Sequence, residues 1–123
     1  MKKETQAAPV QTEPAYERRR RFPRHYLDVR IQIAVFRDGR TSTLWGRTSE
    51  IGADGVGATL SGQLNSGEVV SMEFAIPVAP HVIKVRGIVR YTYGLHCGFE
   101  FLALTEAQRQ VLQQVCGMLA RIL

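Results

Sequence analysis

An arginine-rich segment, Glu17–Arg24, contains the residue types best suited to chemistry with an anion. It holds five of the sixteen Lys and Arg residues of the chain, and the remaining eleven basic residues balance eleven acidic ones. The formal net charge of +5 therefore equals the charge of these five arginines, which indicates a local anionic partner. An arginine side chain binds phosphate with two parallel hydrogen bonds and also stacks on flat rings. A run of charge is equally compatible with a solvated tail, and the run alone does not separate the two interpretations.

Elsewhere the residue types and spacings predict no catalytic or metal-binding site. The two cysteines, Cys97 and Cys116, and the three histidines are scattered along the sequence, and none of them has the spacing of a metal-ligand pair. The sequence also has no nucleophile elbow and no glycine-rich phosphate loop that leads into a helix. We therefore expect a binding protein rather than an enzyme, with no cofactor and no metal.

Composition is that of a soluble domain. The chain has 123 residues, 45% of them hydrophobic, which suits one domain with a modest core. Residues 4–15 are polar and include Pro9 and Pro14, so no apolar segment of a signal peptide follows the first lysines. No apolar run has the length of a membrane span. We expect a cytoplasmic protein that has no membrane partner and keeps both cysteines reduced.

The elements that must position the arginines are predicted to be β-strands. Residues 26–36 alternate apolar and polar side chains, which is typical of a half-buried strand. Asp38-Gly39 predicts a hairpin turn into a return strand over residues 41–51. Four more strands are predicted at 56–60, 68–76, 82–93 and 97–101. The glycines between these segments fall where turns need them.

The period of the apolar residues changes near the end of the chain. Thr105 and Gln108 have the spacing of a capping box, which begins a helix. An apolar stripe at helical spacing follows, formed by Val111, Leu112, Val115, Leu119 and Ile122. We expect this stripe to pack on the sheet rather than to bind a partner. Six short antiparallel strands and one helix predict a small barrel or a strongly curled sheet, because closure protects strand edges.

The chain is predicted to divide into a leader and one domain. Residues 1–16, rich in Gln, Thr, Ala and Pro, are expected to be disordered. The domain would cover 17–123, with a basic arm over 17–25, a barrel over 26–103 and a helix over 105–122. Because Pro23 disfavours helix at the preceding residue, the arm should be extended where it meets the first strand. Such an arm can fold over the outer surface of the barrel.

Two motifs and their order resemble those of the PilZ domain family. Arg20-Arg21-Phe22-Pro23-Arg24, before the first strand, resembles the RxxxR arm of that family, with Arg20 and Arg24 as its two arginines. Glu50-Ile51-Gly52-Ala53-Asp54-Gly55, at the end of the second strand, occupies the place of the family's [D/N]xSxxG motif. The segments Val85–Val89 and Gly98–Phe101 and the terminal helix also resemble the family.

The resemblance implies an all-β fold with a C-terminal helix, a six-stranded antiparallel barrel that binds bacterial cyclic di-GMP. It implies that the ligand contacts Arg19, Arg20, Arg21, Arg24, Glu50, Gly52 and Gly55. An arginine fork can meet N7 and O6 of guanine, and a guanidinium can stack on the base. In the family, an arginine at the position of Arg19 accompanies an intercalated dimer of the ligand. The implied role is a receptor or adaptor that relays the messenger level to a downstream protein, which the sequence does not identify.

The sequence departs from the second motif at two positions. Glu50 stands where the family has Asp or Asn, and its longer carboxylate can still accept the N1 and N2 hydrogens of guanine. Gly52 stands where the family has serine, so a hydroxyl group is lost. Alternation along a strand places the Ser49 side chain on the face opposite Glu50, while Thr48 shares the face of Glu50 but precedes the motif. Gly55 keeps the final glycine, which allows a bend and a close approach.

Two other functions are compatible with these residues. The residues at positions 50 and 52 favour a PilZ-like module that binds protein without nucleotide. A single-stranded nucleic-acid binder on a small barrel would combine a basic groove with exposed aromatic rings. The candidate rings are Tyr26, Trp45, Tyr91 and Tyr93, but most of them fall in phase with core positions. Because the basic charge forms an arm rather than a groove, nucleic acid is the least favoured partner.

Overall fold

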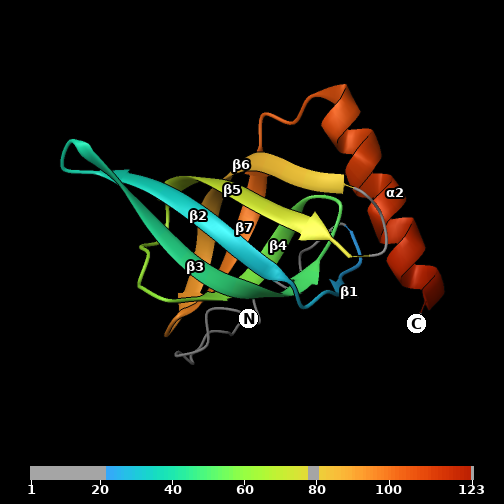
Figure 1. Ribbon diagram of the computed structural model, residues 1–123, viewed down its shortest axis with the longest axis horizontal. Helices are drawn as coiled ribbons and strands as arrows, with labels where there is room; N and C mark the ends of the chain where they lie inside the picture. Colours follow the sequence, from blue (N-terminus) through green and yellow to red (C-terminus); the bar gives the residue numbers. More distant parts are fainter. Residues whose placement is uncertain (1–21, 78–80, 123) are drawn as a thin grey trace, which may run out of the picture.

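The computed structural model describes residues 22–77 and 81–122. Six strands form the barrel: β2 Arg30–Arg37, β3 Arg40–Ile51, β4 Gly55–Leu60, β5 Val69–Ile76, β6 His81–Tyr93 and β7 His96–Leu102. Each is antiparallel to two neighbours, in the order β2-β5-β6-β7-β4-β3 and back to β2, so the sheet is closed (Figure 1). A short strand, β1 His25–Tyr26, pairs with the end of β3, and α2 Glu106–Ile122 ends the fold. The predicted six-stranded antiparallel barrel with a C-terminal helix is confirmed.

The first two barrel strands form a hairpin whose turn was visible in the sequence. Arg37 of β2 is the register partner of Arg40 of β3, so the turn contains only Asp38 and Gly39. Both turn residues have positive φ angles, 51° and 77°, as a two-residue turn of this handedness requires. The hairpin reaches beyond the rest of the barrel (Figure 1), which leaves the Phe36 side chain at its end 71% exposed.

The prediction of one continuous strand over residues 26–36 is wrong, because the chain interrupts it at Leu27–Val29 between β1 and β2. Thr48 of β3 lies beside the interruption, and its side chain is buried. The Thr48 hydroxyl accepts a hydrogen bond from the Val29 amide at 3.0 Å and donates one to the Leu27 carbonyl oxygen. These bonds replace part of the regular ladder and hold the segment between β1 and β2 against β3.

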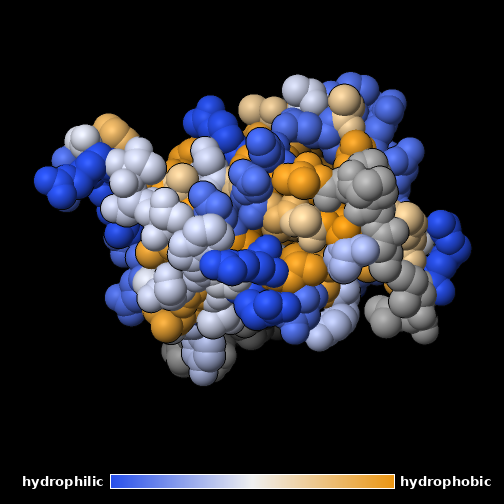
Figure 2. Space-filling view, in the orientation of Figure 1, coloured by the Kyte–Doolittle hydropathy of each residue, from blue (hydrophilic) through white to orange (hydrophobic). Residues whose placement is uncertain are grey.

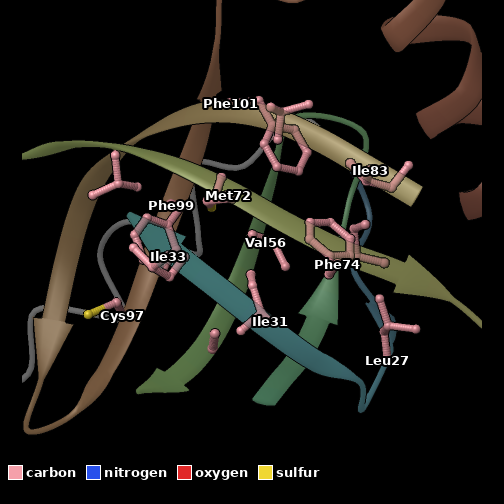
Figure 3. Packing of buried hydrophobic residues seen from close by; sticks show 14 of the residues in the cluster. Leu27, Ile31, Ile33, Val56, Met72, Phe74, Ile83, Cys97, Phe99 and Phe101 are labelled. Atoms are coloured by element: carbon pink, nitrogen blue, oxygen red, sulfur yellow. The ribbon is translucent and has the colours of Figure 1, made fainter. Parts of the chain in front are cut away.

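The core fills the interior of the barrel. Figure 3 shows Ile31, Ile33 and Phe99 among side chains that point inward from strands on different sides of the barrel. Ile31 and Ile33 are completely buried, and Phe99 is 1% exposed. Burial of alternate residues along each strand gives the closed sheet one apolar interior and a mixed exterior, which is the arrangement that the alternating sequence predicted.

Helix α2 covers one end of the barrel. Its first turn is capped as predicted, because the Gln108 amide donates to the Thr105 hydroxyl and the Thr105 amide donates to the Gln108 side chain. Leu112, Val115 and Leu119 are buried and belong to the same apolar cluster as the barrel interior. The apolar stripe therefore packs against the barrel, as expected. No helix among the described residues is long and apolar enough to cross a membrane.

We expect the two thiols to make the stability of the fold depend on pH. Burial raises the pKa of Cys97 and of Cys116 from 9.0 to about 11. The folded state therefore favours both protonated thiols, and this contribution is complete below about pH 9 and lost as the pH rises through about 11. The midpoint of thermal denaturation should fall across this window more steeply for the wild type than for a Cys97→Ala/Cys116→Ala variant. Parallel pH profiles would contradict this expectation, because lysines and tyrosines titrate equally in both proteins.

Candidate functional site

Some of the predicted site residues lie within the part of the chain that the structure describes, and the others lie outside it. Arg19, Arg20 and Arg21 lie outside the described residues. The structure brings Arg24 together with the turn between β3 and β4, which contains Gly52 and ends at Gly55. The Gly52 amide donates a hydrogen bond to the Gly55 carbonyl oxygen at 2.8 Å, which closes this turn. Glu50 lies at the end of β3, where its register partners are Tyr26 of β1 and Gly57 of β4.

The Arg24 side chain occupies space that is available because residues 52 and 55 are glycines. A Cβ atom on residue 52 would lie 2.9 Å from both the Arg24 Cδ and the Pro23 carbonyl oxygen. A Cβ atom on residue 55 would lie 3.4 Å from Arg24 Nη2 and would clash with the Phe99 carbonyl oxygen of β7. Neither glycine has a positive φ angle. Both are therefore suited to the close approach of neighbouring chain rather than to a special backbone conformation.

The guanidinium of Arg24 is buried beside one acidic group. The Arg24 side chain is only 7% exposed, and its Nη2 atom lies 3.4 Å from Oδ1 of Asp54, a residue of the turn between β3 and β4. Within the described part of the chain, Arg24 Nε, Arg24 Nη2 and Asp54 Oδ1 are buried without a hydrogen-bond partner. The contact is thus a loose ion pair. Buried polar atoms without partners are uncommon in folded proteins, and they require an explanation at this site.

The unpartnered atoms of Arg24 belong to one edge of its guanidinium. Nε and Nη2 form the fork that binds a phosphate or carboxylate with two parallel hydrogen bonds, and the same fork fits N7 and O6 of guanine. The donors that suit an anionic guanine nucleotide are therefore those that the described residues leave unsatisfied. Because both atoms are buried, an anion can use this edge only after the guanidinium moves.

Two paired glycines of neighbouring strands, Gly57 and Gly98, lie near Glu50. A Cβ atom on Gly57 of β4 would lie 3.3 Å from Glu50 Cγ and 3.3 Å from the Ser49 hydroxyl oxygen. Gly98 of β7 is the register partner of Gly57, and the Tyr91 ring lies directly over Gly98, where it would clash with any side chain. Both glycines and the Tyr91 ring are buried, and Glu50 beside them is half-buried.

The predicted orientation of Ser49 is wrong. The register of β3 against β4 shifts between Thr48 and Glu50, so Ser49 lies at a bulge. A bulge places two residues opposite one, and consecutive side chains then no longer alternate strictly. As a result, Ser49 and Glu50 both border Gly57. Thr48, which was expected to share the face of Glu50, is instead buried and bonded to the joint between β1 and β2.

Most of the four aromatic candidates were predicted to fall at core positions, and this prediction is wrong. Tyr26, Trp45 and Tyr93 are 64%, 42% and 62% exposed, so they are not core residues. The Trp45 ring is covered by the Arg30 guanidinium, whose central carbon lies 4.3 Å from the ring centroid. Tyr91 is 4% exposed. An irregularity of β6 between Val89 and Tyr91 changes the phase of that strand, which the alternating pattern did not reveal.

Three surface arginines of the barrel are paired more closely than Arg24. Arg37 donates to both carboxylate oxygens of Glu68, at 2.8 and 2.7 Å, and this contact lowers the pKa of Glu68. Arg47 lies 2.7 Å from Asp28, and a third ion pair joins Arg90 to Glu100 at 2.6 Å. These short pairs contrast with the loose contact of Arg24 and Asp54.

Two hollows border α2 and lie apart from the arginine site. The larger, about 420 Å³, lies between β5, β6 and the start of α2, where Ser71, Glu73 and Arg86 line it. The smaller, about 230 Å³, lies between β6 and α2. Figure 2 shows hydrophobic residues gathered where β5 and β6 approach the helix. The described residues contain no group of three or more His, Cys, Asp or Glu side chains that could hold a metal ion.

A side chain at position 52 should destabilise the site. Gly52→Ala should lower the free energy of unfolding by roughly 1–3 kcal/mol, because the new methyl group meets the Pro23 carbonyl and the Arg24 stem. Gly62→Ala is a matched control: its Cβ atom would also meet an atom at 2.9 Å, but that atom is the end of the Leu44 side chain, which can turn away. Chemical denaturation measures both. Equal losses would show that the backbone contact at position 52 is unimportant.

The comparisons with known proteins agree with this architecture. A model of the PilZ domain family matches residues 18–117. The chain is similar to the PilZ domain of YcgR from Escherichia coli, solved with c-di-GMP, at 21% identity and a TM-score of 0.67, over 84% of this chain and 92% of that one. It is also similar to the PilZ domain of CeSA from a cellulose-synthesizing bacterium, at 14% identity and a TM-score of 0.60, over 78% of this chain and 97% of that one.

A third similar structure is longer than this chain. The inhibitor of motility MotI, or DgrA, from Bacillus subtilis matches at 19% identity with a TM-score of 0.64, over 80% of this chain and 49% of that one. The chain thus spans about half the length of that protein. No curated protein matches the chain by sequence.

Proposed function

Because the chain belongs to the PilZ domain family, we propose that it is a receptor for cyclic di-GMP that relays the level of this messenger to a partner protein in the bacterial cytoplasm. It would act by binding alone, without catalysis or a cofactor. The observation that carries the proposal is the unsatisfied Nε–Nη2 edge of Arg24 at the turn between β3 and β4. The similar YcgR domain was solved with c-di-GMP, which supports this ligand.

The roles of the residues follow from the chemistry of the ligand. Cyclic di-GMP carries two phosphates and two guanines. Arg20 and Arg24 would bind phosphate or the N7 and O6 edge of guanine, and Arg21 would add to the positive charge of the arm. Arg19 would stack on a second guanine in an intercalated dimer of the ligand. Gly52 and Gly55 would serve by leaving space for Arg24 rather than by contacting the ligand through side chains.

Glu50 is the proposed acceptor for guanine. Its carboxylate lies beside Gly57, and it can accept from the N1 and N2 hydrogens of one base. Adenine has no hydrogen on N1 and no amino group on C2, so this contact should select cyclic di-GMP over cyclic di-AMP. The specificity of the receptor would thus come from an acceptor on the barrel, and most of its affinity from the arginines.

The partner-binding alternative is a PilZ domain that has lost its nucleotide. One observation favours it: Arg24 is buried beside Asp54 rather than open to solvent. In that case, the Arg24–Asp54 pair would be a permanent structural contact, and the exposed rings of Tyr26 and Tyr93 would be available to a protein. The titration described below separates this alternative from the receptor.

Glu50→Gln should weaken binding of cyclic di-GMP by about tenfold or more, because a hydrogen bond to a charged group contributes roughly 1.5–3 kcal/mol. The Gln side chain has the same length as Glu, but its amide has only one acceptor oxygen. Its NH2 group would face the second guanine hydrogen, and two donors cannot form a hydrogen bond with each other. Glu73→Gln on β5 is a control with the same change of charge on another exterior position. Isothermal calorimetry measures both. Equal affinities for the two variants would remove Glu50 from the site.

A further inference from the structure

The Arg24–Asp54 pair lies against the C-terminal helix. α2 contacts β1, the strand that directly follows Arg24. The charges of Arg24 and Asp54 also reach the thiol of Cys116, which lies in the third turn of α2: Arg24 lowers the pKa of this thiol and Asp54 raises it, although burial has the largest effect. The pair therefore lies in a covered position beside the turn between β3 and β4, with α2 nearby.

This covered position conflicts with a direct role in binding. The Arg24 side chain is 7% exposed, and its Nε and Nη2 atoms are buried. A nucleotide cannot place a phosphate or a guanine edge within hydrogen-bond distance of these atoms while they remain covered. If Arg24 binds the ligand, its guanidinium must first leave Asp54.

The stored position is held weakly enough for this to happen. Nη2 and the Asp54 carboxylate are 3.4 Å apart, and the contact does not have the geometry of a hydrogen bond. Two donors of Arg24 and one acceptor of Asp54 remain unsatisfied in this position. An anionic ligand that offers two aligned acceptors would satisfy the donors, and departure of Arg24 would open Asp54 Oδ1 to water. Both changes favour the bound state.

We propose that Asp54 is a positioning residue that holds Arg24 in a stored conformation, and that cyclic di-GMP competes with Asp54 for the guanidinium. The inference rests on the proposed function. Only the fraction of molecules in which Arg24 has left Asp54 can bind, so the apparent affinity is reduced by that fraction. When Arg24 leaves Asp54 for the ligand, the arrangement of charges near α2 also changes. This change gives a physical route from the ligand to the surface of α2.

The opposite role of Asp54 makes a different prediction. An acidic residue can orient an arginine toward a ligand, and its removal then weakens binding. If Asp54 stores Arg24 instead, its removal strengthens binding, because an uncompensated charge is less stable in the buried position. The direction of the effect separates the two roles.

The test is the kinetics of cyclic di-GMP binding to the full chain, followed by stopped-flow fluorescence with a labelled ligand. Asp54→Asn should raise the association rate constant roughly three- to tenfold, because the guanidinium is then free of residue 54 in a larger fraction of molecules. The dissociation rate constant should not change, because Arg24 no longer contacts residue 54 in the complex. Asp54→Glu, which keeps the charge, should associate more slowly than Asp54→Asn. Asp28→Asn, which breaks the surface pair with Arg47, is the matched control and should bind as the wild type does.

Each outcome decides the matter. An association rate constant that is unchanged or lower in Asp54→Asn, with a wild type that binds, overturns the inference and leaves the receptor function intact. A faster dissociation would show that Asp54 supports the bound state, and would also overturn it. If Asp54→Asn does not fold, Asp54→Ser provides the same comparison. A folded wild type that binds no cyclic di-GMP overturns both the proposed function and the inference.

Discussion

Reversing the charge of Arg20 should lower the affinity for cyclic di-GMP by more than about a hundredfold. The change removes a bidentate, charge-assisted contact worth roughly 1.5–3 kcal/mol and places a carboxylate near the phosphates of the ligand. Arg20→Glu is therefore the substitution with the largest expected effect on function. Calorimetric titration measures the affinity, and the midpoint of thermal denaturation shows whether the barrel remains folded.

The control for Arg20→Glu is Arg40→Glu. Arg40 lies at the exposed end of the β2–β3 hairpin, next to the turn formed by Asp38 and Gly39. The control carries the same change of net charge at a position remote from the turn that holds Gly52. A comparable loss of affinity in both variants would mean that the arm attracts the ligand only through its overall charge. The assignment of Arg20 as a specific contact would then be wrong.

Arg24 is a poorer probe of binding than its place in the motif suggests. Its side chain is buried beside Asp54, so Arg24→Glu would place two carboxylates together in a covered position. Such a substitution should reduce stability as well as binding. A loss of affinity in that variant would therefore not distinguish a lost contact from a disturbed fold.

Removing the Thr48 hydroxyl should have the largest effect on stability among the polar substitutions of the barrel. Thr48→Val keeps the shape of the side chain but leaves the Val29 amide and the Leu27 carbonyl oxygen without their partner. Each unsatisfied buried group costs roughly 1–3 kcal/mol, so the free energy of unfolding should fall by about 2–4 kcal/mol. Chemical denaturation with urea measures this loss.

The matched control is Thr43→Val on the same strand. Thr43 is exposed, and valine suits a strand as well as threonine does. Its free energy of unfolding should change by less than about 0.5 kcal/mol, which is usual for a surface substitution. If Thr48→Val were equally mild, the hydroxyl would not be what holds the segment between β1 and β2 against β3.

The barrel could be predicted from the sequence because alternation and turn chemistry act locally. The Asp38-Gly39 turn, the alternation along β5 and the capping box of Thr105 and Gln108 each depend on neighbouring residues, and each is present in the structure. Where the chain departs from regular alternation, the same reasoning fails. The bulge at Ser49 and the irregularity before Tyr91 both change which face a side chain occupies, and no local signal in the sequence marks them.

The proximity of three candidate site residues could be predicted from the sequence motifs, while their binding roles stay predictions. The motif resemblance identified Arg24, Gly52 and Gly55, and the structure brings these residues together. Asp54 was missed, because it lies inside the second motif at a position with no assigned role, and only the fold reveals that it faces Arg24. The consequence for Gly52 was also missed. A glycine there removes a hydroxyl, but it also makes room for the Arg24 stem, so restoring a serine would disturb Arg24 as well as add a donor.

The central claim, that the chain is a cyclic di-GMP receptor, is tested most directly by one calorimetric titration of the wild-type protein. Cyclic di-GMP is titrated beside GTP and cyclic di-AMP, and the folded state is verified by thermal denaturation. We expect saturable binding of cyclic di-GMP and at least about tenfold weaker binding of the other two nucleotides, because Glu50 and the arginine forks require two linked guanines. A folded protein that binds no cyclic di-GMP, or that binds all three nucleotides equally, would contradict the claim.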